Sequence, residues 1–182
     1  MSERLSLYIS IQIDQKALSD FLEQPCRPPT LDEQWTKWWD TRQMASKQLL
    51  DPAHHGFKGS GRALLDQILQ DKYAFGQEHY NNERSLYTFL SVFYTENFLE
   101  LLPLLCLLKN LGTHQGPRQR GFALIYDYYW GSEEVMAFME FNQGVAQLFT
   151  YECIGEIPAA LLDEATRSLT AAMEAYMRTK NE

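Results

Sequence analysis

An alternation of side chains over residues 122–141 limits the fold more than any other part of the sequence. Aromatic or aliphatic residues occupy every second position of its first half, which is typical of a strand with one buried face. Gly131 and Ser132 follow with glycine first, which suits a type II′ turn and predicts a hairpin. A second turn with Gly144 in the left-handed position predicts a third strand over 145–152. The segment is therefore expected to be a three-stranded antiparallel meander.

The two-residue turn decides which side chains share a face of this meander. One face is free of charge and is predicted to be the core face; it pairs Tyr128 with Val135, Tyr126 with Ala137, Leu124 with Met139 and Phe122 with Phe141. The other face has carboxylates and Tyr129 at its ends, with Glu134 opposite Glu152. Its middle is apolar, with Ile125, Met136, Phe138 and Leu148. We expect either one of the chain's own helices or a partner to cover this middle.

The remaining patterns predict two further strands and five helices. Strands are expected at Leu5–Ile13 and Leu86–Tyr94, and helices over 15–23, about twenty residues from 31, 62–69, 97–110 and 158–178. Thr30 is the expected N-cap of the second helix, because Glu33 follows at capping-box spacing. The stretch 73–84 is expected to be irregular. The sequence therefore predicts one α+β domain over residues 1–182, with about five strands in a mainly antiparallel sheet and about five helices.

The negative charge of the chain is concentrated in residues 121–166. This segment contains eight Asp or Glu residues and no Lys or Arg, and the net charge of the whole sequence is −8. Nine aromatic residues in the same segment favour a folded acidic surface over a disordered tail. A concentrated negative field attracts cationic partners and repels nucleic acid and anionic lipid, so binding to either is not expected.

No catalytic or metal-binding signature stands out. His54 and His55 are adjacent, without the spacing of a metal site, and a solvated surface role is expected for them. The stretch Gly56–Arg62 resembles a phosphate loop in its glycine spacing but lacks the Lys and Ser or Thr that complete one, so a helix-entry loop is expected. No activated Ser or Cys nucleophile is indicated. We therefore expect no catalytic residues, no metal and no cofactor.

The cysteines, the N-terminal residues and the apolar runs indicate the cellular compartment. Cys26, Cys106 and Cys153 have neither disulfide-framework nor zinc spacing and are expected to be reduced. The N-terminal residues lack a secretory signal pattern. The longest apolar run, 98–108, is too short to cross a bilayer. A cytoplasmic location without membrane insertion is therefore expected.

The acidic meander is the candidate partner-binding surface, because large amphipathic side chains ringed by charge are favoured at protein interfaces. The residues expected to face a partner are Asp127, Tyr129, Trp130, Glu133, Glu134, Met136, Glu140 and Glu152. The simpler interpretation is that any acidic protein places its carboxylates somewhere, and a hairpin tip is an ordinary place for them.

A small acidic α+β chain with a charged aromatic sheet face and no active-site motif resembles the bacterial immunity proteins that neutralise cognate toxins of polymorphic or secretion-system origin. The resemblance implies a tight inhibitory complex with a basic toxin, commonly a nuclease. Two alternatives stay open. One is an enzyme or small-molecule-binding protein with a pocket near Tyr8, Trp38, Tyr87 and the two histidines. The other is a scaffold or adaptor that forms oligomers, such as a homodimer, through the sheet face.

Overall fold

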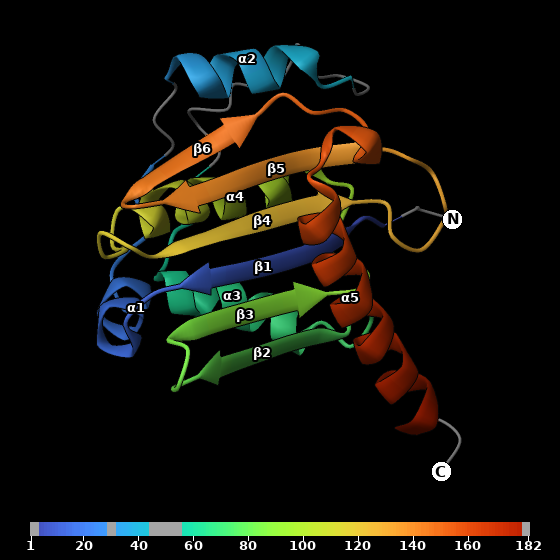
Figure 1. Cartoon of the computed structure of the whole chain (residues 1–182), viewed down its shortest axis with the longest axis horizontal. Coiled ribbons are helices and arrows are strands. Elements are labelled where there is room, and N and C mark those ends of the chain that lie inside the picture. The colour runs from blue at the N-terminus through green and yellow to red at the C-terminus, as the bar shows by residue number, and fades with distance from the viewer. Residues whose placement is uncertain (1–3, 29–31, 44–55, 180–182) are drawn as a thin grey trace.

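Six antiparallel strands form one sheet in the order β2-β3-β1-β4-β5-β6 in the computed structural model, which describes residues 4–28, 32–43 and 56–179 (Figure 1). The strands are β1 Ser6–Gln12, β2 Gly76–Asn81, β3 Leu86–Ser91, β4 Arg120–Tyr126, β5 Val135–Asn142 and β6 Val145–Phe149. The helices are α1 Gln15–Leu22, α2 Glu33–Thr41, α3 Gly61–Gln70, α4 Phe98–Gly112 and α5 Ala159–Thr179. The predicted α+β class with a mainly antiparallel sheet is confirmed.

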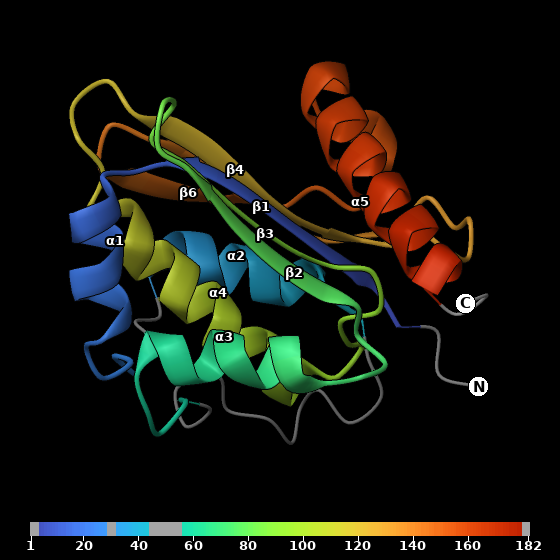
Figure 2. The same cartoon turned by 90° about the horizontal axis from the view of Figure 1, so that it is seen from below.

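Strand β1 lies in the centre of the sheet, and both of its faces are buried. Leu7, Ile9 and Ile11 belong to the core between the sheet and α1–α4, whereas Tyr8 belongs to the core under α5. Figure 2 shows α1 to α4 on one side of the sheet and α5 alone on the other. Of the two coverings left open for the second face of the meander, a helix of the chain or a partner, the structure shows the chain's own helices on both sides of the sheet.

Helix α5 is attached to the sheet by a line of tyrosine hydroxyls as well as by apolar packing. The hydroxyl of Tyr8 donates to Glu164 at 3.0 Å. The hydroxyls of Tyr126 and Tyr128 share hydrogen bonds with Thr166 and Thr170, at 3.0 and 2.9 Å. These contacts follow one side of the helix turn by turn and set its direction across the sheet.

The register of the meander differs from the prediction by one residue. Phe122 lies opposite Glu140, and Leu124 lies opposite Phe138. The connection between β4 and β5 spans residues 127–134 and is not a two-residue turn at Gly131 and Ser132. Because a slip of one residue exchanges the two faces of a strand, Phe138 lies under α5 with Phe122 and not on the predicted outer face.

The turn between β5 and β6 also differs from the predicted three-residue turn. Gln143 and Gly144 form a two-residue connection, with φ values of 53° and 86°. Positive φ at both central residues is the requirement of a type I′ turn, whose twist matches an antiparallel hairpin. Leu148 therefore lies opposite Met139.

Two further elements depart from expectation. Helix α2 begins after Asp32, whose carboxylate accepts a hydrogen bond from the backbone N–H of Trp35 at 2.9 Å. Helix α2 ends at Thr41, with Arg42 as an extended C-cap, so it is much shorter than the roughly twenty residues predicted. The predicted cap Thr30 lies outside the described residues, as do His54, His55 and residues 44–50 of the predicted helix. Strand β2 occupies a stretch expected to be irregular; it is a polar, largely exposed edge strand without apolar alternation. Among the described helices, none combines the length and apolarity needed to cross a membrane.

Candidate functional site

The loop that joins β4 to β5, residues 127–134, is folded around the carboxylate of Asp127. Its two oxygens accept hydrogen bonds from the backbone N–H groups of Trp130 at 2.7 Å and Ser132 at 2.8 Å. Burial alone would raise the pKa of Asp127, but hydrogen bonds from Ser132, Trp130 and Gly131 outweigh it and lower the pKa. Asp127 is only 7% exposed, so its predicted outward position is wrong. Its carboxylate holds the loop together.

Tyr129 and Trp130, in the same loop, keep much of their surface in water. They are 47% and 43% exposed, so their predicted outward position is confirmed. Their rings meet edge to face, with centroids 5.0 Å apart, and Tyr129 makes a second such contact with Phe93 at 4.8 Å. Gly131 supplies a φ of 82° where the chain reverses just beyond them. Both aromatic side chains are thus positioned by the loop while remaining accessible.

The contact with Phe93 is part of a continuous row of five rings. Tyr176 of α5 lies 3.5 Å from Phe75, and Phe75 lies 5.5 Å from Phe93, measured between ring centroids. The row continues through Tyr129 to Trp130. It joins segments far apart in the sequence along one end of the sheet. The exposed pair is therefore the outer end of a packed aromatic structure.

Three carboxylates lie on the segments beside the exposed pair. Glu133 and Glu134 belong to the loop, and Glu152 follows β6; all three are exposed. The backbone N–H of Val135 donates to the carbonyl of Glu152 at 2.9 Å, and that of Ile154 donates to Glu133 at 2.9 Å, which holds the two segments side by side. No Lys or Arg of the described residues is within ion-pair distance of these carboxylates. We call Tyr129, Trp130, Glu133, Glu134 and Glu152 the loop-end surface.

A buried arginine lies beneath this surface, and the sequence analysis missed it. Arg42, the C-cap of α2, donates to the backbone carbonyls of Val135, Met136 and Tyr151, at 2.5, 3.1 and 2.8 Å. Burial lowers the pKa of Arg42, and Glu152 is the first of three carboxylates that oppose this effect. One indication in the sequence pointed to the burial of Arg42: it lies one helical turn after Trp38, on the buried side of α2.

The other predicted partner-facing residues lie elsewhere. Met136 is buried in the core between the sheet and α1–α4, and its carbonyl accepts a hydrogen bond from the indole N–H of Trp38 at 2.9 Å. Its predicted outward position is wrong, because helices α1–α4 cover the face on which Met136 lies together with Ile125 and Leu148. Glu140 is half-buried at the opposite end of β5, where it lies across from Phe122. Of the eight residues predicted to face a partner, only five therefore form the loop-end surface.

The pocket expected for a small-molecule protein is not formed by the residues named for it. Tyr8 belongs to the core under α5, whereas Trp38 and Tyr87 belong to the core on the other side of the sheet. The sheet separates them. Among the residues that the structure describes, no three His, Cys, Asp or Glu side chains are grouped to hold a metal ion.

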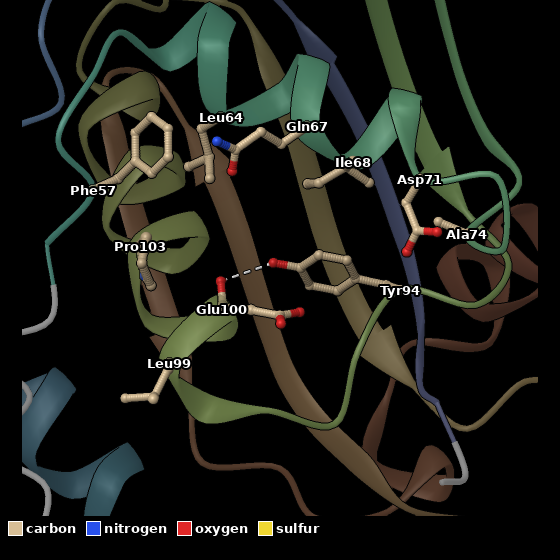
Figure 3. Close-up of a pocket in the computed structure, with 10 residues that line it drawn as sticks. All are labelled: Phe57, Leu64, Gln67, Ile68, Asp71, Ala74, Tyr94, Leu99, Glu100 and Pro103. Atoms are coloured by element: carbon tan, nitrogen blue, oxygen red, sulfur yellow. Dashed lines mark hydrogen bonds between the residues drawn. The ribbon is translucent and has the colours of Figure 1, made fainter. Parts of the chain in front are cut away.

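A cavity of about 330 Å³ lies between α3 and α4 (Figure 3). Its lining is mostly apolar and includes Leu64, Ile68 and Pro103. The hydroxyl of Tyr94 donates to the backbone carbonyl of Glu100 at 2.9 Å, and Asp71 is paired with Arg4 at the same distance. The Tyr94 hydroxyl and the Asp71 carboxylate therefore have partners within the protein, and the Gln67 amide and the Glu100 carboxylate are the other polar side-chain groups of the lining.

The chain matches no family model, no curated protein and no solved structure.

Proposed function

We propose that this protein is a binding protein of the immunity type, which inhibits a basic protein toxin, with a nuclease-type effector as the expected class. One observation carries the proposal. The exposed rings of Tyr129 and Trp130 are fixed beside three carboxylates that have no ion-pair partner among the described residues. Residues with these properties are the ones that protein interfaces use as anchors.

The geometry favours binding in two ways. First, Asp127 and Phe93 hold the exposed rings in place before any partner arrives, which lowers the entropy lost on association. Second, exposed carboxylates increase the rate of encounter with a positively charged surface. A nuclease groove that binds phosphates is such a surface. Binding there would prevent nucleic acid from entering.

The test begins with capture of the partner from the native host, using the unmodified chain and the double variant Tyr129→Ala, Trp130→Ala in parallel. The captured protein is then purified, and its association with the double variant Glu133→Lys, Glu134→Lys is measured over a range of salt concentrations. We expect the lysine variant to associate at least about tenfold more slowly at low salt, with a smaller salt dependence. We expect the alanine variant to dissociate faster.

The matched control is Glu23→Lys, Glu83→Lys, which makes the same charge change at exposed positions at the end of α1 and in the β2–β3 loop. Equal association of the lysine variant and this control would contradict the proposed surface. A captured partner that is a second copy of the chain would assign the loop-end surface to self-association and would contradict inhibition. If the unmodified chain suppresses the enzymatic activity of the partner and the alanine variant does not, inhibition is supported directly.

A further inference from the structure

Helix α5 leaves part of its sheet face uncovered, and a groove of about 420 Å³ lies there. Figure 1 shows the helix crossing the sheet toward one end of the strands, with the other end of the same face open. The groove lies between the first turns of α5 and the strand ends that include Gln12 and Arg120. Its size falls in the range of pockets that hold small molecules. It is separate from the loop-end surface, so binding in the groove does not depend on the proposed function.

Charges of both signs line this groove without pairing with one another. Glu140 comes from β5 and Glu164 from α5, while Arg120 comes from the start of β4. None of the three side chains forms an ion pair within the described part of the chain. The hydroxyl of Tyr8 donates to one oxygen of Glu164 at 3.0 Å, which fixes this carboxylate beside the groove.

The negative and the positive side chains of the groove are separated in space. Phe122 lies directly opposite Glu140, and Arg120 is two residues before Phe122 on the same strand. At about 3.4 Å of rise per residue, Arg120 therefore lies about 7 Å along β4 from the position that faces Glu140. Phe122 and Leu161 supply apolar surface to the same groove. The groove thus has an anionic side, a cationic end and apolar surface of its own.

We infer that the groove binds a free α-amino acid with an apolar side chain. The ammonium group would pair with Glu140 and Glu164, the carboxylate with Arg120, and the side chain would lie against Phe122 and Leu161. A simple anion would be repelled by two carboxylates, and a simple amine would leave Arg120 without a partner. A zwitterion with an apolar body matches all three charged groups and the apolar surface of the groove.

The first experiment is calorimetric titration of the whole chain with L-leucine, L-isoleucine, L-valine, L-methionine and L-phenylalanine. L-leucine is compared with 3-methylbutylamine, which lacks the carboxylate, and with 4-methylpentanoate, which lacks the amine. We expect at least one amino acid to bind and, if L-leucine is among them, each truncated analogue to bind about tenfold more weakly or worse. No binding of any of the five at about 10 mM, a concentration that would reveal even a millimolar dissociation constant, would overturn the inference. So would an analogue that binds as tightly as the amino acid.

The second experiment locates the site with Arg120→Gln and Glu140→Gln. Arg120→Gln should remove the preference for the amino acid over its amine analogue. Glu140→Gln should reduce the preference over its carboxylate analogue, because Glu164 remains. The controls are Arg84→Gln and Glu83→Gln, which make the same changes in the exposed β2–β3 loop. Unchanged affinity in both groove variants would overturn the location. If either variant fails to fold, amide NMR shifts of the unmodified chain decide: shifts centred on Ser10 and Phe122 support the site, and shifts elsewhere contradict it.

Discussion

The carboxylate of Asp127 accepts a hydrogen bond of 2.7 Å from the backbone N–H of Trp130, three residues further along the loop. A buried acid therefore positions one of the most exposed aromatic residues of the chain. Replacing Asp127 with alanine removes the acceptor for two backbone donors, because Ser132 donates to the same carboxylate. We expect a loss of about 1–3 kcal/mol in the free energy of unfolding, measured in urea. Glu133→Ala, at an exposed position of the same loop, should change it by less than about 0.5 kcal/mol.

The same carboxylate predicts a pH dependence. Hydrogen bonds lower the folded-state pKa of Asp127 below its unfolded value of about 3.9. Its contribution to stability is therefore complete above about pH 4 and is lost as the pH falls through the lowered folded-state pKa. Unfolding of the wild type and of Asp127→Asn should be compared from pH 7 to pH 2. We expect the stability difference to shrink only in the acid range; a constant difference would contradict this role.

Arg42→Lys tests the buried guanidinium. Lysine keeps the charge but has no planar set of donors, so it cannot serve the carbonyls of Val135, Met136 and Tyr151 together. We expect a destabilisation of about 1–3 kcal/mol in urea unfolding, together with faster amide exchange at Val135. Arg84→Lys, on the exposed β2–β3 loop, serves as the control and should unfold like the wild type. An unchanged free energy of unfolding in Arg42→Lys would show that these hydrogen bonds contribute little to stability.

The tyrosine hydroxyls under α5 predict a local effect. Phenylalanine at Tyr8, Tyr126 and Tyr128 keeps the rings and removes three hydroxyls that hydrogen-bond to Glu164, Thr166 and Thr170 of the helix. The Tyr8 hydroxyl also accepts a hydrogen bond from Ser168 at 3.3 Å. At about 1 kcal/mol for each hydroxyl, the triple variant should be about 3 kcal/mol less stable. Hydrogen exchange should accelerate more in α5 than in α4, which lies on the other side of the sheet. Equal acceleration in both helices would contradict a specific attachment.

Cys106 should be unreactive in the folded protein. Burial raises the pKa of this thiol to about 11, so at pH 8 only about one molecule in a thousand carries the reactive thiolate. Iodoacetamide labelling followed by mass spectrometry should modify Cys106 only after denaturation. Rapid labelling of the native protein at this residue would show that the helix α4 environment opens readily.

Local patterns in the sequence predicted most elements because their causes are local. Asp14 caps α1, with its carboxylate accepting hydrogen bonds from the backbone N–H groups of Lys16 and Ala17 just after it in the sequence. The alternation of β1 and the apolar stripes of α3 and α5 predicted those elements to within about two residues. Strand β2 could not be found this way, because an exposed edge strand buries too few side chains to show a period.

The register and the site depend on non-local burial. Phe138 and Met139 are neighbours on opposite faces of β5, and both are fully buried. When a helix covers each face, alternation no longer says which side is the core. The exposed pair Tyr129 and Trp130 could be predicted from an acidic aromatic loop. The burial of Asp127 could not, because it depends on backbone donors that only the folded loop presents.

The position of β1 in the sheet has a consequence for biosynthesis. The strand leaves the ribosome before either of its neighbours, and Ser6, for example, hydrogen-bonds to a residue 86 positions later. Its apolar face, which carries Leu7, Ile9 and Ile11, and both of its ladder edges stay unsatisfied until β3 and β4 have emerged. Strand pairs between residues far apart in the sequence form slowly. A nascent chain stalled before β4 would therefore expose a ready template for aggregation, and would depend on chaperones that the finished protein no longer needs.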